Sequence, residues 1–179
     1  MTALGGAEDA GAETDLLDLR TLGLSMFNPD AEPDAAALAM VESLEGADGL
    51  LWSSPLYQGS VAGSFKNALD WLHLPSRSVY LTDKAIGLIS VSGGTQGLQA
   101  INAMEFSVRA LRAWAVPYVV PIPGAAFDEN EEIRDDGVER QLKTLGSEVV
   151  RLAAHFVEVE EPDHRTECER SRQLVASAA

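Results

Sequence analysis

Residues 48–72 read DGLLWSSPLYQGSVAGSFKNALDWL, and this stretch decides the fold. It begins with a continuous apolar run, 48–53, that has the length of a strand and lacks the alternation of a half-exposed one. Residues 62–74 carry apolar side chains at the spacing of one helix face, and Pro75 ends that helix. A strand covered on both faces, a loop of small residues and an amphipathic helix together predict one unit of a parallel sheet.

The same alternation continues on both sides of this stretch. Residues 1–12 are expected to be the end of a helix and 14–19 a short strand, followed by a proline-containing loop. Further buried strands are predicted at 84–91 and 116–122, with Pro117 at the start of a strand or on an edge. Amphipathic helices are predicted from Asp34 to Gly46, over 98–114 and over 137–156.

Strands that alternate with helices predict right-handed crossovers and an open three-layer α/β sheet. The 179 residues, 46% of them hydrophobic, suit one domain with a substantial core. We expect that domain to cover residues 1–157 and an acidic, disordered tail to cover 158–179. Ligands of such sheets bind beyond the carboxyl ends of the strands, so function is expected in the loops at 53–61 and 92–97.

The net charge of −15 argues against nucleic acid and against an anionic membrane surface as partners. The charge is unevenly distributed: residues 1–48 hold eleven acids and one base, whereas residues 49–125 hold three acids and five bases. The middle of the chain is therefore the part where an anionic cofactor would be favoured.

Cysteine and histidine give no sign of a metal site. The single cysteine, Cys168, can form no disulfide within the chain, and the three histidines lack the spacing of metal ligands. No apolar stretch reaches the length of a membrane span, and the acidic N-terminus does not resemble a signal peptide. The sequence predicts a cytoplasmic protein without a metal.

Several common chemistries of α/β proteins lack their motifs here. The chain has no phosphate loop of the type GxxxxGK[ST], no GxGxxG dinucleotide fingerprint and no GxSxG nucleophile elbow. Ser60 lies in a superficially similar GSVAG segment, but the spacing is wrong and no histidine is placed to activate it. Hydrolase and nucleotide triphosphatase functions are therefore not expected.

Two loops instead carry a recognisable pattern. Pro55-Leu56-Tyr57-Gln58-Gly59-Ser60, then Gly63 and Lys66-Asn67-Ala68-Leu69-Asp70-Trp71, resembles the signature of the NADPH-dependent FMN reductase family. Ser92-Gly93-Gly94-Thr95-Gln96-Gly97 is similar to the second flavin-ring loop of that family. The resemblance extends from about residue 13 to about residue 157, and Gln58 stands where the family usually has Asn.

The resemblance implies a flavodoxin-like fold and FMN and NADPH as cofactors. It also implies an oxidoreductase that passes hydride through bound FMN to a flavin, a quinone or a similar small acceptor, and a homodimer or homotetramer. No side-chain acid or nucleophile is obligatory in such a reaction, so we name no catalytic residue. The residues implied to contact the flavin are Pro55, Leu56, Tyr57, Gln58, Gly59, Ser60, Ser92, Gly93, Gly94, Thr95, Gln96 and Gly97.

The residue types in these loops suit a flat ring with a polar edge. Glycines let backbone N–H groups approach a ligand edge closely, and such donors stabilise the charge that a flavin gains on reduction. Tyr57 could supply an aromatic wall. The alternative is that both loops are ordinary connections between a strand and a helix. For the helix at 62–72 we expect core packing and a subunit interface, with Lys66 and Asp70 as an i, i+4 pair.

One part of the family pattern has no counterpart in the sequence. The first strand and the serine-containing loop that holds the FMN phosphate are missing, which would leave the strand at 14–19 without its neighbour. A start codon assigned too late and a genuine fragment are the two explanations, and we favour the first. If flavin binding is lost, the rival function is a non-catalytic flavodoxin-like electron carrier or interaction domain.

Overall fold

A four-stranded sheet organises the part of the chain that the computed structural model describes, which comprises residues 1–74, 76–130 and 132–160. The sheet has the order β2-β1-β5-β6, in which β1, β5 and β6 are parallel and β2 is antiparallel to β1. Its strands are β1 (Gly49–Tyr57), β2 (Ser60–Val61), β5 (Ala85–Ser92) and β6 (Trp114–Pro123). A separate hairpin consists of β3 (His73–Leu74) and β4 (Arg77–Ser78).

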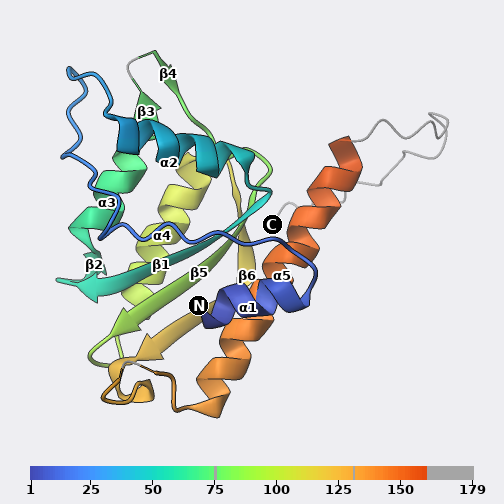
Figure 1. Cartoon of the computed structure of the whole chain (residues 1–179). Helices are drawn as coiled ribbons and strands as arrows, with labels where there is room; N and C mark the ends of the chain where they lie inside the picture. The colour runs from blue at the N-terminus through green and yellow to red at the C-terminus, as the bar shows by residue number, and fades with distance from the viewer. Residues whose placement is uncertain (75, 131, 161–179) are drawn as a thin grey trace, which may run out of the picture.

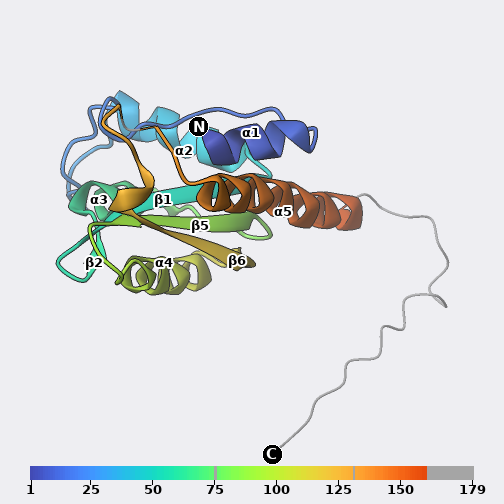
Figure 2. The same cartoon turned by 90° about the horizontal axis from the view of Figure 1, so that it is seen from below.

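Helices cover both faces of the sheet. Figure 2 shows α5 and α1 on one side of β5 and β6, and α4 on the other. The helices are α1 (Thr2–Asp9), α2 (Ala35–Gly46), α3 (Gly63–Asp70), α4 (Leu98–Ala110) and α5 (Asp136–Glu160), and a short 3-10 turn follows β6 at Gly124–Ala126. Three layers around a mostly parallel sheet agree with the predicted α/β architecture (Figure 1).

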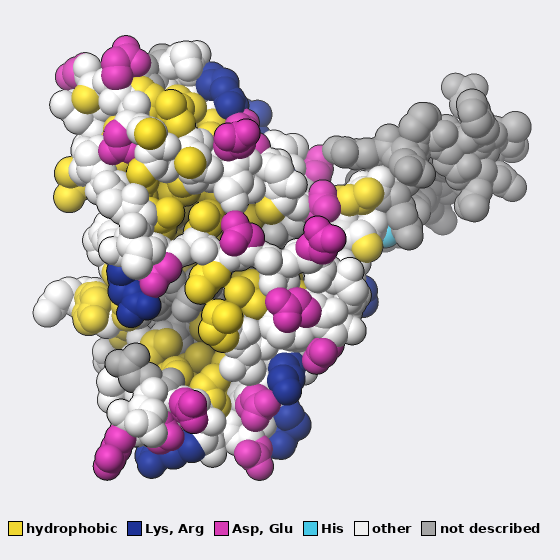
Figure 3. All heavy atoms as spheres, in the orientation of Figure 1, with side chains coloured by type: hydrophobic (Ala, Val, Ile, Leu, Met, Phe, Trp, Pro, Cys, Tyr) yellow, Lys and Arg dark blue, Asp and Glu magenta, His cyan; other side chains and the backbone are white. Residues whose placement is uncertain are grey.

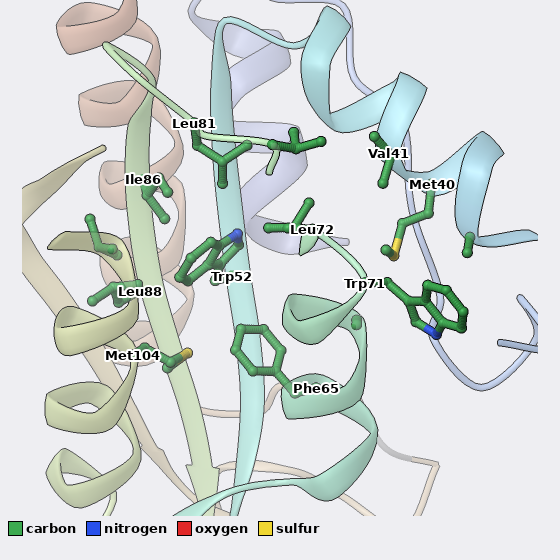
Figure 4. Close-up of a cluster of buried hydrophobic side chains, with 14 of the residues drawn as sticks. Met40, Val41, Trp52, Phe65, Trp71, Leu72, Leu81, Ile86, Leu88 and Met104 are labelled. Atoms are coloured by element: carbon green, nitrogen blue, oxygen red, sulfur yellow. The ribbon is translucent and has the colours of Figure 1, made fainter. Parts of the chain in front are cut away.

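Two hydrophobic cores hold the helices to the sheet. The first lies between β1, β5 and helices α2, α3 and α4, where Trp52 packs edge-on against Phe65 with ring centroids 5.6 Å apart. Figure 4 shows these rings beside Trp71, Leu72 and Met40. The second core lies under α1 and α5. Because β5 is buried along almost its whole length, it is the central strand that its apolar sequence predicts.

Tight glycine contacts hold α1 against α5. A Cβ atom at Gly6 would lie 2.3 Å from the carbonyl oxygen of Lys143, and one at Gly146 would lie 2.1 Å from that of Ala3. The hydroxyl of Ser147 donates a hydrogen bond to the carbonyl of Gly6 at 3.1 Å. The two helix backbones can approach this closely only because neither position carries a side chain.

The expected strand at 14–19 is wrong. The structure assigns residues 12–18 to no helix or strand, and a turn follows in which Thr21 N–H donates to the carbonyl of Asp18. A strand is defined by its ladder of hydrogen bonds to a neighbour. Among the described residues no strand lies next to this segment, so it has no partner for a ladder.

Three helix ends also differ from the expectation. The predicted helix at 62–74 ends at Asp70, because His73 and Leu74 enter the β3–β4 hairpin. The helix predicted over 98–114 ends at Ala110, and Trp114 begins β6 instead. The last helix continues to Glu160. Residues 161–179, which contain Cys168 and most of the expected tail, lie outside the described residues.

The two edges of the sheet differ in sequence. In β6, Pro117, Pro121 and Pro123 each lack a backbone N–H, and among the strands that the structure describes β6 pairs with β5 alone. Pro117 therefore lies in an edge strand, which is one of the two positions that the sequence predicts for it. On the other side, β1 pairs with β2 only at Leu56 and Tyr57. Residues 49–55 of β1 therefore face no strand on their outer side within the described chain.

Asp34 begins α2 as its N-cap, and its carboxylate makes the stability of this region depend on pH. The hydrogen bonds from Ala37 N–H, at 2.8 Å, and then from Ser25 N–H, at 3.2 Å, hold the pKa of Asp34 below its ordinary value. A lowered pKa adds stability above the unfolded-state value and loses it as the pH falls through the folded-state value. We expect Asp34→Ala to lower Tm by about 2–4 °C at neutral pH.

That difference between the two proteins should shrink as the pH falls below the ordinary pKa of aspartate, and it should disappear in acid below the lowered folded-state pKa, where the carboxyl group is protonated in both folded and unfolded chains. Thermal unfolding followed by circular dichroism at neutral pH and in acid measures it. A Tm difference that stays constant into acid would assign the stabilisation to packing of Asp34 and not to its charge.

Candidate functional site

Three loops meet at one edge of the sheet because β1, β5 and β6 are parallel and end in register. Pro55 lies opposite Val91, and Ser92 lies opposite Pro123. The chain therefore leaves all three strands at the same level, as expected for the ligand edge of an open α/β sheet. The first two of these loops contain every residue that the sequence predicts to contact a flavin.

The first loop is a tight hairpin between β1 and β2. Tyr57 pairs with Ser60, so Gln58 and Gly59 form a two-residue turn. Both have positive φ, 49° and 80°, the combination that defines a type I′ turn. The side chain of Tyr57 stands at the tip, and the residue is 65% exposed. The turn thus presents an aromatic ring to solvent at the carboxyl edge of the sheet.

Gln58 is strained in this turn, because residues with a side chain rarely adopt positive φ and asparagine does so more readily. We expect Gln58→Asn to raise the free energy of unfolding by a few tenths of a kcal/mol to about 1 kcal/mol. Urea unfolding of the two proteins measures the change. Gly59→Ala is the control with the opposite expected sign: it places a side chain at positive φ and should lower the free energy of unfolding. A gain in stability for both variants would contradict the assigned turn.

The second loop leaves its backbone open to a ligand. A Cβ atom at Gly93 or at Gly94 would meet no other atom within 4 Å. The N–H groups of Gly94 and Thr95 donate no hydrogen bond to any residue that the structure describes. Unpaired donors next to open space are the arrangement that an acceptor on a ligand edge requires.

Three buried serines shape both loops: Ser92 is among the predicted flavin contacts, whereas the sequence analysis did not single out Ser54 or Ser90. The hydroxyl of Ser54 accepts a hydrogen bond from Ala62 N–H at 2.9 Å, which closes the first loop. The hydroxyls of Ser90 and Ser92 donate to the carbonyls of Gly97 and Gly94, each at 2.7 Å. All three serines are at most 5% exposed. Hydroxyls at the ends of otherwise apolar strands were the signal that could have identified them.

Gly97 closes the second loop against the sheet. A Cβ atom there would lie 2.9 Å from the hydroxyl oxygen of Ser90 and 3.1 Å from Cβ of Pro121. Any side chain would therefore push the loop away from β5 and β6. Gly97 thus fixes the loop, whereas Gly93 and Gly94 border open space.

Side chains at α3 bind the backbone of the segment at residues 25–27. Asn67 accepts a hydrogen bond from Phe27 N–H at 2.7 Å and donates one to the carbonyl of Ser25 at 2.9 Å. The indole N–H of Trp71 donates to the same carbonyl, also at 2.9 Å. The expected pair of Lys66 and Asp70 is confirmed as a surface salt bridge. This helix holds the segment at 25–27, which agrees with the expected packing role.

The chemistry of the two loops suits a flat, polar-edged ring more than a phosphate. Backbone amides, hydroxyls and one aromatic side chain are available, whereas neither 53–61 nor 92–97 contains a lysine or an arginine. No cluster of three potential metal ligands occurs in the described part of the chain. A large cavity lies elsewhere, beside β1; its lining includes Ser53, Val91 and Ile122 near this edge but none of residues 54–61 or 92–97.

A search for membrane-spanning segments gives a negative result for the helices that the structure describes: none is long and apolar enough to cross a bilayer. The longest of them, α5, is amphipathic and covers the second core with one face.

Comparison with known proteins identifies the family of this chain. Residues 1–127 match the family model described as NADPH-dependent FMN reductase, and the match includes both loops. The chain is 31% identical over 150 residues to an NADPH azoreductase of Bacillus sp. (strain OY1-2), covering 82% of this chain and 79% of the relative.

A second relative is longer than this chain. Identity to the NADPH-dependent FMN reductase ArsH of Acidithiobacillus ferrooxidans is 32% over 145 residues, which covers 79% of this chain. The aligned part is only 60% of that protein, and 59% of a similarly named protein of Rhizobium meliloti. The chain thus spans about three fifths of the length of these relatives.

Solved structures share the fold at low identity. The flavoenzyme NAD(P)H:(acceptor) oxidoreductase FerB of Paracoccus denitrificans superimposes with a TM-score of 0.68 at 20% identity, covering 87% of this chain and 88% of its own. RosB with a bound intermediate gives a TM-score of 0.71 at 12% identity, covering 99% and 90%. A flavodoxin from Archaea gives 0.61 at 12% identity, covering 86% and 87%. These likenesses establish a flavodoxin-like fold.

Proposed function

Because the chain belongs to the NADPH-dependent FMN reductase family, we propose that it is an FMN-dependent NAD(P)H oxidoreductase. It would reduce a flavin, a quinone or a similar small acceptor. The observation that carries the proposal is the pair of loops at the ends of β1 and β5, whose open glycines and unpaired N–H groups face the ligand edge of the sheet.

Bound FMN would supply the hydride chemistry, so this chain's own residues need only bind and orient the ring. In this proposal the N–H groups of Gly94 and Thr95, which donate to no described group, would donate to the ring edge, and the exposed Tyr57 would flank the ring face. Donors fixed by the serine-anchored loops also favour the negative charge that a reduced ring carries. The full set of proposed contacts is Pro55, Leu56, Tyr57, Gln58, Gly59, Ser60, Ser92, Gly93, Gly94, Thr95, Gln96 and Gly97.

Gly94 provides the sharpest test of the ring site. Gly94→Ala has space for its methyl group and no positive φ to strain, so the fold should be unchanged. The methyl group would instead stand between the backbone and the ring. We expect the Kd for FMN to rise roughly tenfold or more, measured by quenching of FMN fluorescence on titration with the protein.

Gly5→Ala is the matched control, since a Cβ atom at Gly5 also meets nothing within 4 Å and lies on α1 away from the loops. FMN affinity should be the same as in the unsubstituted chain. If the Gly94→Ala variant and the unsubstituted protein bind FMN with the same Kd, this loop is not part of the flavin site.

The absence of lysine and arginine from both loops leads to a prediction about the ligand itself. If the 179-residue chain holds the flavin mainly through its ring, riboflavin and FMN should bind with Kd values within roughly threefold of each other, because a charge-assisted phosphate contact would add about 1.5–3 kcal/mol. The same fluorescence titration with both ligands measures the ratio. A strong preference for FMN would reveal a phosphate site outside the two loops.

A measurement of NADPH oxidation distinguishes the proposed enzyme from the alternative, a non-catalytic electron carrier or interaction domain. Steady-state oxidation of NADPH with menadione as acceptor is expected if the proposal holds, and comparison with NADH gives the nucleotide preference. A chain that binds FMN but does not oxidise NADPH would support the electron-carrier function instead. We further propose a cytoplasmic homodimer or homotetramer, which analytical ultracentrifugation tests.

A further inference from the structure

One peptide unit of the second loop, between Gly94 and Thr95, is hydrogen-bonded at one end only. Its carbonyl accepts a hydrogen bond from the hydroxyl of Ser92 at 2.7 Å. Its N–H, on Thr95, donates to no residue that the structure describes. The carbonyl and the N–H belong to one planar trans unit and point in opposite directions. The carbonyl is therefore directed at the end of β5, and the N–H points away from it.

The hydroxyl of Ser92 is used inside the protein. Ser92 is 5% exposed, and the single proton of its hydroxyl goes to the Gly94 carbonyl. Ser92 also pairs with Pro123 at the end of β5, so its position is fixed by the sheet. Its side chain therefore acts on a ligand at this edge through the peptide of Gly94 and Thr95.

A hydrogen bond to a peptide carbonyl strengthens the N–H of the same peptide as a donor. The bond draws electrons toward the oxygen and leaves the N–H more positive, and hydrogen bonds linked in this way strengthen one another by about 10–30% each. The effect is larger away from water, and the Ser92 hydroxyl is buried. An acceptor that meets the N–H of Thr95 is thus held more strongly than it would be without Ser92.

The charge around the two loops makes such dipoles important. Neither 53–61 nor 92–97 contains a basic or an acidic residue. On the face of the molecule in Figure 3, acidic side chains are widely spread and basic ones occur in a few separate places. Within the two loops, a ligand that becomes negative is therefore stabilised by backbone dipoles and not by a cation. The strength of each N–H donor matters correspondingly more.

We propose, on the basis of the proposed function, that Ser92 is a positioning residue that raises the reduction potential of the bound flavin through the Gly94–Thr95 peptide. NAD(P)H passes a hydride, which is two electrons with one proton, to the ring and leaves as NAD(P)+, so that the ring gains one negative charge. The N–H of Thr95, polarised by Ser92, binds the negative ring more tightly than the neutral one. Ser92 thereby favours the reduced ring without its side chain touching it.

Ser90 provides a matched control. Its hydroxyl donates to the carbonyl of Gly97, also at 2.7 Å, and its side chain is fully buried. This bond anchors the other end of the same loop, but the peptide that it polarises continues into Leu98, the first residue of α4. Ser90→Ala thus removes an anchor of the same kind and leaves the peptide of Gly94 and Thr95 polarised. The two serines separate anchoring of the loop from polarisation of its donor.

The first measurement needs no flavin. In Ser92→Ala the carbonyl carbon resonance of Gly94 should move upfield, because a carbonyl that loses a hydrogen bond is less polarised, and the amide nitrogen resonance of Thr95 should move with it. In Ser90→Ala both resonances should stay in place. Triple-resonance NMR of the two variants and the unsubstituted chain measures these positions, and the remaining resonances show whether each variant is folded.

The second measurement is the reduction potential of bound FMN, obtained by anaerobic reduction in equilibrium with a dye of known potential. Ser92→Ala should lower the affinity for reduced FMN, relative to oxidised FMN, by roughly two- to fivefold, which makes the two-electron potential about 10–20 mV more negative. Ser90→Ala should weaken both affinities alike and leave the potential unchanged. Ser92→Thr, which keeps the hydroxyl, should restore the potential. Ser92→Cys, whose thiol is a weak donor, should give a smaller shift in the same direction and takes the place of Ser92→Ala if that variant does not fold.

Three results would overturn the proposal. These are an unchanged potential in Ser92→Ala, an equal drop of the potential in Ser90→Ala, and an unchanged carbonyl resonance of Gly94 in Ser92→Ala. A failure of the proposed function is distinguishable from all three, because the unsubstituted chain would then bind no FMN. The role of Ser92 toward the flavin would fall with it, whatever the resonances show.

Discussion

Trp71→Ala is expected to lower the free energy of unfolding by about 3–5 kcal/mol, because it removes a large ring from the middle of the first core. Trp71 is 1% exposed, and its ring meets that of Phe27 edge-on at 5.3 Å between centroids. The substitution also removes the indole hydrogen bond to the carbonyl of Ser25. Figure 4 shows the ring at the end of α3, facing Met40 of α2. Urea unfolding followed by far-ultraviolet circular dichroism measures the loss.

Trp114 provides the control for a tryptophan outside the core. It is 53% exposed at the start of β6, where it stacks on Phe156 at 5.6 Å between centroids. Trp114→Ala should cost about 1 kcal/mol or less. If the two substitutions cost the same, α3 would not be packed on the first core as the structure shows.

Gly146→Leu is expected to detach α1 from α5. A Cβ atom at this position would lie 2.1 Å from the carbonyl oxygen of Ala3, so the leucine cannot be accommodated by a small shift. Overpacking of this kind costs about 1–3 kcal/mol. The burial of Ala3 and Ala7 under the helix is lost as well. We expect fast hydrogen exchange in α1 while the amides of β5 remain protected.

Gly5→Ala tests the same helix without a collision. A Cβ atom at Gly5 meets nothing within 4 Å, and alanine is a better helix former than glycine. The free energy of unfolding should rise by up to about 1 kcal/mol. For Gly146→Leu, slow hydrogen exchange in α1 would contradict the prediction, because it would show that the contact between α1 and α5 adapts to a side chain.

The alternation of apolar runs and amphipathic helices was sufficient to predict an open three-layer α/β sheet, whereas the family was predicted from the resemblance of the two loops. The family and the flavodoxin-like α/β fold expected from it are both confirmed, as are FMN and NADPH as the cofactors of the family. The segment at 14–19 shows the limit of this reasoning. Its composition suits a strand, but strand formation depends on a neighbour that may lie far away in sequence, which a local pattern does not report.

For the candidate site, the sequence predicted which loops form it but not the contacts that hold them. The sequence identified which loops follow buried strands, and the structure brings both to one edge. It did not identify Ser54 and Ser90: a serine near the end of an apolar strand is a visible signal, but the sequence does not show which loop group its hydroxyl bonds. Nor did it reveal that Asn67 and Trp71 share the carbonyl of Ser25, a contact across more than forty residues. The flavin contacts themselves stay a prediction.

The three prolines of β6 hinder the addition of another strand at that edge of the sheet. A fibre that grows strand by strand needs two receptive edges on every molecule, one to accept the previous copy and one to offer to the next. In the described part of the chain, residues 49–54 of β1 all keep their backbone N–H, while β6 lacks three. Growth of a fibre through strand pairing at β6 is therefore disfavoured, because an added strand would find three backbone acceptors on its own side without a donor opposite them.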